Sequence, residues 1–483
     1  MLFRSIQASR GQIFDRNGKL LAFDKPIASF NAITYQVKDV DQLDSIFCSI
    51  FNRERGYYSD KINSHNGFVW LERRVEVSES KKIKSCDIPG VYSIENYRRV
   101  YPYGAIGAQI IGYTDIDNRG IEGLELYYND RLSGLMGEAI LFSDGIGNKN
   151  PLLSYEGKRP IKGDNLHLTI DIELQSIVEA ELMEVVESNN AVGGYAVFIE
   201  PNTGKVLAMA SYPGYDPNDL SNSTAMGRKN RVVTDTYEPG SVFKLVTYAS
   251  ALADSGFSPD EKLYCESGSY KTRYRTVTDV HKYDTLSLSE IIINSSNVGT
   301  VKIAEKIDNS LLYSRARSFG FGTPTGIDFG GEMSGIIKHP QRWSALTDLA
   351  FPMGYEITVT PLQVACAYGV IANDGVLLEP YLVEKITNET GALKYFREPI
   401  QVRRVLDKEV NDIIKETLIA VVDSGTGKLV KIEGIKVAGK TGTAKKVKIG
   451  SKGYWAGHYL ASFVGFAPAD TKPLVSGMVT IDD

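Results

Sequence analysis

The sequence predicts an α+β protein in which an antiparallel sheet is covered by helices and preceded by a strand-rich region. Strand-like stretches stand at both ends of the second part of the chain, with long helical patterns between them. A helix expected from Ser241 is apolar on nearly all sides and therefore belongs inside a domain. The chain has 483 residues, which exceeds one ordinary domain, so two or three domains are expected.

The composition is that of a globular protein and excludes several classes of function. Apolar residues make up 43% and charged residues 23% of the chain. The net charge is -5, and Lys and Arg are spread along the chain, which argues against nucleic acid as a partner. Cys48, Cys86, Cys265 and Cys366 lie far apart without metal-ligand spacing, so no metal or cofactor is expected. The sequence contains no run of eighteen apolar residues, so it predicts no membrane span.

Residues 1–160 are predicted to form a strand-rich domain with few candidates for catalysis. Short β-branched or aromatic stretches alternate there with Asp, Asn and Gly turns. Residues 15–18 predict the turn of a hairpin. Residues 40–52 and 78–85 read as helices. The composition becomes basic and loop-like over residues 157–163, and this predicts a domain boundary.

The second domain is expected over residues 161–483. It opens with a strand at 165–170, and a helix follows from Asp171. Leu174, Ile177, Val178 and Leu182 are expected on one side of that helix. The other predicted elements are a hairpin at 194–210, helical pieces over 286–307 broken at 294–297, helices at 361–372 and 410–422, and strands at 436–444, 460–466 and 474–481.

The helix expected from Ser241 carries a serine and a lysine in its first turn. Ser241 and Lys244 are three residues apart, so both side chains face the same side of the helix. A lysine in a partly dry place has its ammonium form disfavoured and can take the proton of a neighbouring hydroxyl. The helix N-terminus is positive where negative charge would develop. The pair therefore predicts a serine nucleophile activated by a lysine base.

A second Ser-x-x-Lys pattern provides the alternative. Ser78 and Lys81 have the same spacing but lie in a run of charged residues. Such a run is typical of a solvated helix face. The apolar setting favours Ser241 as the nucleophile.

Two downstream patterns complete the predicted site. Ser295-Ser-Asn297 lies between helices, and Lys440-Thr-Gly-Thr443 lies on a strand. Alone, the first is compatible with a turn and the second with a strand carrying a solvated lysine. Together with Ser241 and Lys244, in this order, they are the pattern of serine acyl-transferases that act on D-alanyl peptides and β-lactams.

The chain thus resembles the class B penicillin-binding proteins, which are peptidoglycan D,D-transpeptidases, over nearly its whole length. Residues 114–117, Gly354 and Tyr355 are more similar to the cell-division branch than to the elongation branch. Further matching stretches are Arg10-Gly-Gln-Ile-Phe-Asp-Arg-Asn-Gly18, Arg99-Val-Tyr-Pro102, Gly120-Ile-Glu-Gly-Leu-Glu125, Glu200-Pro-Asn-Thr-Gly204, residues 354–363 and Val437-Ala-Gly-Lys-Thr-Gly-Thr-Ala444. The resemblance implies a penicillin-binding transpeptidase domain at 161–483 after a non-catalytic pedestal of the dimerisation type at 1–160.

The resemblance also implies roles for the predicted site residues. Ser241 would attack the penultimate D-Ala carbonyl of a stem pentapeptide, with Lys244 as base. Ser295 would relay a proton, and Asn297 would contact Lys244 and the substrate amide. Lys440 would attract the substrate carboxylate and, by like-charge repulsion, keep Lys244 neutral. Thr441, Gly442 and Thr443 would bind the substrate, and the backbone N–H groups of Ser241 and Thr443 would form the oxyanion hole.

The implied partners are stem pentapeptides, β-lactam antibiotics that acylate Ser241, a membrane glycosyltransferase and other division proteins. The implied location is the bacterial inner membrane, with the catalytic domain in the periplasm. Only nine residues precede Arg10, so we expect the family's membrane anchor to be absent from this chain, with Met1 added. The chain stops at Asp483, so we also expect the family's C-terminal helix to be absent.

Two rival functions remain at this point. A D,D-carboxypeptidase or β-lactamase would use the same chemistry with water as the acceptor. A β-lactam sensor, or a scaffold that recruits other wall enzymes, would bind without turnover. The complete set of three motifs favours an enzyme, and the long first region favours a cross-linking one.

Overall fold

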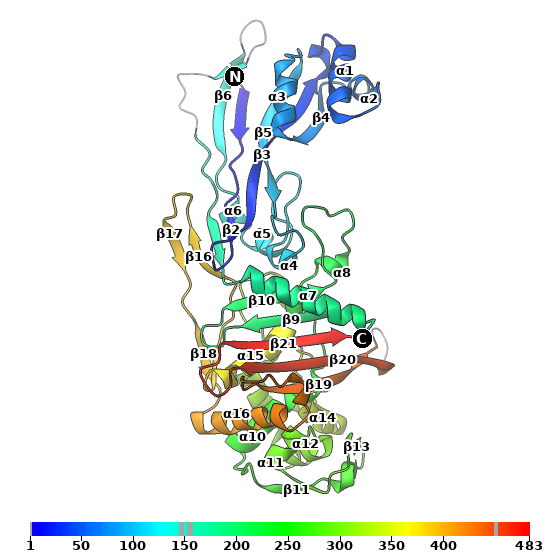
Figure 1. Ribbon diagram of the computed structural model, residues 1–483, viewed down its shortest axis with the longest axis vertical. Coiled ribbons are helices and arrows are strands. Elements are labelled where there is room, and N and C mark those ends of the chain that lie inside the picture. Colours follow the sequence, from blue (N-terminus) through cyan, green and yellow to red (C-terminus); the bar gives the residue numbers. More distant parts are fainter. Residues whose placement is uncertain (1, 144–148, 152–157, 449–452) are drawn as a thin grey trace.

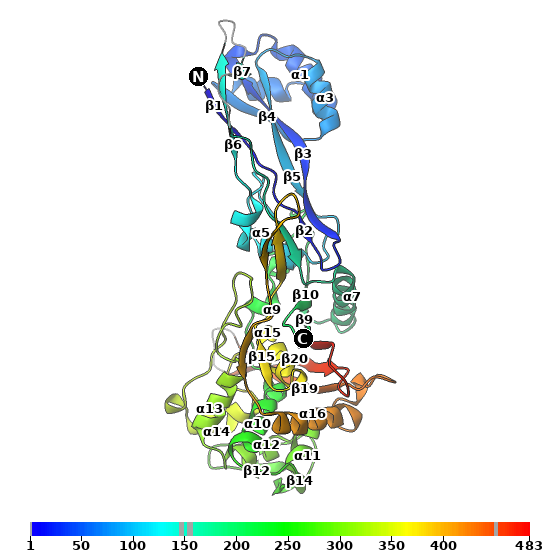
Figure 2. The ribbon, with the colours of Figure 1, turned by 90° about the vertical axis from the view of Figure 1, so that its left-hand side faces the viewer.

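The computed structural model describes residues 2–143, 149–151, 158–448 and 453–483. The molecule is elongated, with the N-terminal region at one end and the helices that follow Ser241 at the other (Figures 1 and 2). The α+β fold class is confirmed. Met1 and Gly157, the first residue of the predicted boundary loop, lie outside the described residues.

A three-stranded antiparallel sheet with helices beside it forms the far end of the N-terminal region (Figure 1). Phe30, Phe47 and Tyr58 are buried between the sheet and the helices. The predicted helices at 40–52 and 78–85 are both confirmed. The elements are β3 (Leu20–Ile33), β4 (Phe68–Val75), β5 (Val91–Val100), α1 (Val40–Phe51), α2 (Tyr57–Asn63) and α3 (Val77–Ser85).

Three short helices make the lower part of this region, and a second small sheet lies at its far end, level with α1 and α3 (Figures 1 and 2). The sheet has the order β1-β6-β7 and is antiparallel. The elements are α4 (Ala108–Ile111), α5 (Gly123–Tyr127), α6 (Asn129–Leu132), β1 (Leu2–Ile6), β6 (Gly137–Ser143) and β7 (Lys149–Pro151).

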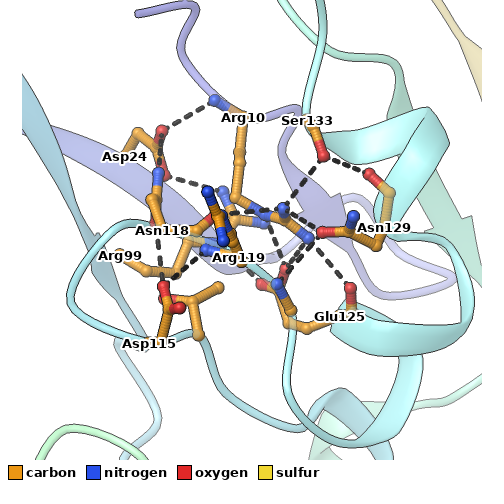
Figure 3. Close-up of polar contacts among 11 residues, drawn as sticks. Arg10, Asp24, Arg99, Asp115, Asn118, Arg119, Glu125, Asn129 and Ser133 are labelled. Carbon is orange, nitrogen blue, oxygen red and sulfur yellow. Dashed lines mark hydrogen bonds and ion pairs between the residues drawn. The ribbon is translucent and has the colours of Figure 1, made fainter.

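A buried network of charges joins the segments of this lower part (Figure 3). Both carboxylate oxygens of Glu125 are paired: Arg10 Nη2 lies 2.7 Å from Oε2 and Arg99 Nε 2.6 Å from Oε1. Asp24 Oδ1 lies 3.2 Å from Arg99 Nη1, and Asp24 Oδ2 accepts from the Asn118 side chain at 2.9 Å. Glu125 is 0% exposed. The network therefore ties together stretches that are more than a hundred residues apart in the chain.

One sheet runs through the predicted domain boundary at residue 160. The hairpin predicted around residues 15–18 forms, because β2 (Ile13–Phe14) pairs antiparallel with β3. β2 also pairs in parallel with β8 (Asn165–Leu168), which in turn pairs with β16 (Val383–Thr387). Backbone hydrogen bonds therefore hold the two regions together, and the division into two domains stays a prediction.

The second region is built on a five-stranded antiparallel sheet with the order β10-β9-β21-β20-β19. Helix α7 covers one face, and α10, α15 and α16 lie on the other (Figure 1). The predicted hairpin and the three closing strands are confirmed as strands of this sheet. The elements are β9 (Gly193–Ile199), β10 (Val206–Tyr212), β19 (Ala438–Val447), β20 (Tyr454–Ala467), β21 (Val475–Asp482), α7 (Ile172–Ser188), α10 (Lys244–Asp254), α15 (Pro361–Ala372) and α16 (Lys408–Asp423).

Local sequence explains where these helices begin. The Asp171 side chain accepts from the backbone N–H groups of Glu173 and Leu174 and so starts α7. Thr360 and Gln363 form a capping box at α15, with Pro361 at the first helical position. The predicted helix at 361–372 has the observed bounds.

The predicted buried side of α7 is wrong at one position. Ile177 is 59% exposed. The buried side chains are Gln175, Val178, Leu182 and Val186, spaced by three or four residues, together with Ile172. Ile177 is one position, about 100° of helical rotation, away from Val178, and this takes it off the face against the sheet.

The remaining elements are shorter and connect these layers. They are α8 (Ala225–Arg228), α9 (Arg231–Thr234), α11 (Leu288–Ile293), α12 (Asn297–Ala304), α13 (Asn309–Ser318), α14 (Ala345–Ala350), β11 (Lys262–Tyr264), β12 (Ser269–Lys271), β13 (Thr276–Thr278), β14 (Thr285–Ser287), β15 (Val376–Leu378), β17 (Leu393–Phe396) and β18 (Gln401–Arg404). The predicted break at 294–297 is confirmed between α11 and α12.

Candidate active site

Ser241 lies on a tight helical turn that leads directly into a buried helix. The turn, η2 (Gly240–Phe243), is of the 3-10 type, and α10 follows from Lys244 without a break. Gly240 has φ +57°, a value that favours glycine, and a Cβ there would lie 3.3 Å from the Thr443 carbonyl oxygen. The serine is therefore held against the strand that carries the third motif. The predicted helix start is correct in place, but its first turn is tighter than an α-helix.

Lys244 is fully buried and contacts the second motif. Its exposed fraction is 0%. Lys244 Nζ donates to the Ser295 carbonyl oxygen at 2.6 Å and to Asn297 Oδ1 at 2.8 Å, and lies 3.3 Å from Ser295 Oγ. Two N–H bonds of a neutral amine are then occupied, and its lone pair is left to accept a proton. In the part of the chain that the structure describes, no hydrogen bond joins Lys244 to the Ser241 hydroxyl.

The surroundings of Lys244 favour its neutral form. Burial lowers the pKa of Lys244 well below its usual value, and the positive charge of Lys440 lowers it further. The Asp279 carboxylate acts in the opposite direction on this pKa. Desolvation is the largest of these effects, so the buried position alone leaves more of the amine in the neutral form that can accept a proton.

The Ser295–Asn297 segment is a sharp connection between α11 and α12. Ser295 has φ +57°, which is uncommon for a residue with a side chain. Ser296 caps α12, since its hydroxyl accepts from the Gly299 N–H at 2.9 Å. This conformation turns the Ser295 carbonyl and the Asn297 amide toward the same amine.

Strand β19 brings the third motif against the nucleophile. The position of a Cβ on Gly442 would lie 2.9 Å from Val242 Cγ1, so this glycine permits close packing. The Thr441 hydroxyl donates to the Thr426 hydroxyl at 2.9 Å. Lys440 is 1% exposed, and burial lowers the pKa of Lys440 to about 7. Burial thus places Lys440 near its titration midpoint at neutral pH.

The three motifs meet in one cleft of about 250 Å³. Lys244 and Lys440 do not line it, because both are buried. The predicted site residues that line it are Ser241, Ser295, Asn297, Thr441, Gly442 and Thr443. An electrophile in this cleft would lie beside the Ser241 hydroxyl, with the neutral amine of Lys244 beneath it and threonine hydroxyls that can bind an anion. These are the functional groups that acyl transfer requires.

Several residues that line the same cleft are outside all three motifs. Among those that sequence reasoning missed, Asp279 and Thr426 are hydrogen-bonded to a motif. Thr426 follows α16 and binds the Thr441 hydroxyl. Asp279 ends the β-branched stretch at 276–278, and the only available signal was a carboxylate at the end of a strand.

The alternative Ser78 and Lys81 pair is far from this cleft. Both side chains are exposed on α3, at the opposite end of the molecule from α10 (Figure 1). The interpretation of this pair as a solvated helix face is confirmed.

Neither a metal-ligand cluster nor a helix suited to crossing a membrane occurs among the described residues. Within residues 2–143, 149–151, 158–448 and 453–483, no group of three or more His, Cys, Asp or Glu side chains is arranged to hold a metal ion. Across the same residues, no helix has both the length and the apolar character needed to cross a membrane.

Two family models together match most of the chain. A model described as the penicillin binding protein transpeptidase domain matches residues 194–483. A model described as the penicillin-binding protein dimerisation domain matches residues 5–168.

Named relatives are similar over almost the same span. The peptidoglycan D,D-transpeptidase FtsI of Escherichia coli is 33% identical over 99% of this chain and 80% of its own length. The stage V sporulation protein D of Bacillus subtilis is 32% identical over 97% of this chain and 73% of its own length.

Solved structures share the architecture. A peptidoglycan synthetase from Bifidobacterium adolescentis has a TM-score of 0.80 at 23% identity, covering 100% of this chain and 92% of that one. Penicillin binding protein 3 from Mycobacterium tuberculosis, in complex with aztreonam, has a TM-score of 0.78 at 25% identity, covering 99% and 91%.

Proposed function

The chain belongs to the class B penicillin-binding transpeptidases, and from this membership we propose that it cross-links peptidoglycan stem peptides through an acyl-enzyme on Ser241. The family makes it a serine-type peptidoglycan D,D-transpeptidase. One observation supports the assignment of residues: the three motifs meet in one cleft. Lys244 is buried there, its surroundings favour the neutral amine, and it is hydrogen-bonded to the second motif. No cofactor is required for this chemistry.

In the proposed acylation step, Ser241 Oγ attacks the carbonyl carbon of the penultimate D-Ala. Lys244 accepts the hydroxyl proton, and the bond to the terminal D-Ala nitrogen breaks. Ser295, whose Oγ lies 3.3 Å from Lys244 Nζ, passes the proton to the leaving amine. The backbone N–H groups of Ser241 and Thr443 stabilise the oxyanion. An ester between Ser241 and the stem peptide results, and D-Ala is released.

In the second step, the amine of a neighbouring stem peptide attacks this ester. The Ser241–acyl bond breaks, an amide cross-link forms, and the proton from the amine returns to Ser241 through the same lysine. Asn297 Oδ1 holds Lys244 at 2.8 Å in both steps. Before the first step, Thr441 and Thr443 receive the terminal carboxylate of the donor peptide, which later leaves with D-Ala, and the buried Lys440 supplies positive charge behind them. Gly442 lets the strand lie close to the nucleophile.

The finer assignments are part of the same proposal. Residues 114–117 with Gly354 and Tyr355 support a septal role in cell division. A septal transpeptidase works at the inner membrane, with its catalytic domain in the periplasm, beside a membrane glycosyltransferase and other division proteins. β-Lactams, whose strained amide takes the place of the D-Ala bond, would inhibit it by acylating Ser241.

Labelling with fluorescent penicillin tests the nucleophile. The wild-type protein should gain one covalent label, and Ser241→Ala should gain none, because the attacking oxygen is missing. Ser78→Ala is the matched control and should label like the wild type. Intact mass and in-gel fluorescence measure the label. Retention of the label in Ser241→Ala would mean that another residue is the nucleophile.

The lifetime of this label separates the rival functions. A label that persists for many minutes supports the transpeptidase, because water is then a poor acceptor. Rapid loss with turnover would support a β-lactamase or D,D-carboxypeptidase. Absence of labelling in the wild type would leave a sensor, a scaffold or an enzyme that is insensitive to penicillin.

The pH dependence of acylation tests the role of Lys440. Burial lowers the pKa of Lys440 to about 7, so its charge is present below that pH and is lost as the pH rises through it. The second-order rate constant for penicillin acylation should therefore fall about tenfold or more between pH 7 and pH 9. Deprotonation of Lys244 would change the rate in the opposite direction, because only the neutral amine can accept the serine proton.

Lys440→Gln provides the comparison for this pH profile. The variant should be acylated slowly. Its acylation rate constant should no longer decline above pH 7, because residue 440 then carries no charge that can titrate. A wild-type rate that stays flat from pH 7 to pH 9 would contradict the assigned role.

A further inference from the structure

We propose that Asp279 is a positioning residue of the reaction, which holds the Ser295–Asn297 segment in the conformation that presents it to Lys244. This inference rests on the proposed function, because it concerns the same site. Asp279 lies directly after β13 and lines the cleft.

Both carboxylate oxygens of Asp279 are used by the second motif. Oδ1 accepts from the backbone N–H groups of Asn297 and of Val298, the latter at 3.0 Å. Oδ2 accepts from the Ser296 hydroxyl at 2.7 Å. The same hydroxyl accepts from the Gly299 N–H, so it connects the carboxylate to the first turn of α12. Two residues of the motif segment, Ser296 and Asn297, and the residue that follows it, Val298, are thereby fixed to one side chain.

The residue before Asp279 fixes the Asn297 side chain. The Thr278 carbonyl oxygen accepts from Asn297 Nδ2 at 2.9 Å. Since the nitrogen of the amide is held by this carbonyl, the oxygen must face the other way, where Lys244 Nζ lies 2.8 Å away. Residues 278 and 279 therefore determine both the backbone and the amide orientation of Asn297.

A strained residue needs such support. Ser295 has φ +57°, and a residue with a side chain persists in this sparsely populated region only when its surroundings enforce it. On the N-terminal side, the N–H groups of Ser295 and Ser296 donate to Ile292 and Ile291 in the last turn of α11, at 3.1 and 2.9 Å. On the C-terminal side, Asp279 is the enforcing group. Without it, Ser295 is expected to relax and to carry its carbonyl away from Lys244.

Asp279 is itself held in place by the β12–β13 hairpin. Its backbone N–H donates to the Gly268 carbonyl oxygen at 3.0 Å. Gly268 has φ +81°, and a Cβ there would lie 2.8 Å from the His281 carbonyl oxygen, so the two ends of the hairpin pack closely. The hairpin thus fixes the position of Asp279, and the hydrogen bonds of the Asp279 carboxylate fix the position of the second motif relative to the hairpin.

The acylation rate of matched variants tests the proposal. Asp279→Ala removes all three bonds and should lower the second-order rate constant with fluorescent penicillin about 100-fold, as expected for a displaced catalytic group. Asp279→Asn keeps an acceptor for the backbone N–H groups, and its rate constant should fall about tenfold. Asp284→Asn is the control, five residues further along. Its Oδ1 accepts from the Ser267 hydroxyl and, among the described residues, makes no bond to the Ser295–Asn297 segment, so the rate of this variant should stay within twofold of the wild type.

The pH profile distinguishes positioning at the site from a general loss of structure. The charged groups that act on Lys244 are Lys440 and Asp279, and the Asp279 charge raises the pKa of Lys244. Without that charge the pKa of Lys244 falls, and its neutral form persists to lower pH. In Asp279→Asn and Asp279→Ala, the acid limb of the plot of acylation rate constant against pH should therefore move to lower pH. A merely unstable protein would lose active fraction without moving this limb.

Amide hydrogen exchange gives a readout that does not depend on activity. Exchange in a peptide spanning residues 294–300 should accelerate at least tenfold in Asp279→Ala and stay unchanged in Asp284→Asn. If the wild type is labelled and Asp279→Ala is labelled as fast, with unchanged exchange, the positioning role is overturned and the proposed function stands. If the wild type is not labelled at all, the proposed function fails, and exchange alone decides whether Asp279 anchors the segment.

Discussion

Lys244→Met is expected to abolish acylation of Ser241 while the fold stays intact. Methionine has nearly the same length and fills the same space, so no cavity is created in a position that is 0% exposed. The variant has no group that can accept the serine proton. General-base removal costs on the order of 100- to 10,000-fold, and the motif residues act as a unit, so we expect a loss near the upper end.

The stability of Lys244→Met should change little, because two effects oppose each other. Asn297 Oδ1 and the Ser295 carbonyl oxygen lose a donor, which costs about 1–3 kcal/mol. Removal of a desolvated amine, whose pKa is lowered by burial, offsets part of this cost. Stopped-flow acylation and a thermal melt measure the two quantities, with Lys81→Met on the exposed α3 as the control. A variant that still acylates within tenfold of wild type would show that Lys244 is not the base.

Glu125→Gln is expected to destabilise the N-terminal region by about 3–5 kcal/mol. Glu125 is the central anion between Arg10 and Arg99 (Figure 3). Its removal leaves two buried guanidinium groups with Asp24, which pairs with Arg99, as the one remaining anion of this network among the described residues. Buried charges without a partner carry most of this cost. The N–H of glutamine would also point a donor at one of the guanidinium groups, which have only donors to offer.

Urea denaturation of Glu125→Gln against Glu122→Gln measures this effect. Glu122 is three residues away and faces Arg228 at 3.5 Å, but its side chain is 37% exposed, so a loss below about 1 kcal/mol is expected. The urea midpoint for unfolding of the pedestal, followed by the fluorescence of Trp70, should shift to a lower urea concentration only in Glu125→Gln. Equal midpoints for the two variants would show that the buried network contributes no net stability.

The same network predicts how stability responds to acid. Burial alone would raise the pKa of Glu125, but Arg99 and Arg10 outweigh this and hold the pKa below its usual value. A carboxyl with a lowered folded-state pKa contributes stability at pH values above its ordinary pKa, and this contribution is lost as the pH falls. The pedestal of the wild type should therefore lose stability in acid more steeply than that of Glu125→Gln.

The local features of the fold were predictable from sequence because they depend on neighbouring residues. The start of α15 at Pro361 follows from a capping box within four residues. The break between α11 and α12 follows from the polar run at 294–297. Ile177 was assigned to the wrong side because a periodic pattern gives the phase of a helix only within about one residue. The true phase is set by the sheet against which α7 packs.

The site divides along the same line. The sequence alone determined which functional groups are present and in what order: a serine and a lysine one helical turn apart, a Ser-Ser-Asn segment, and a Lys-Thr-Gly-Thr strand. The tertiary structure decided that Lys244 is dry and bonded to Ser295, 51 residues away, and that Asp279 supports this segment from a hairpin. Burial and contacts between distant segments depend on how the whole chain packs, and no local spacing encodes them.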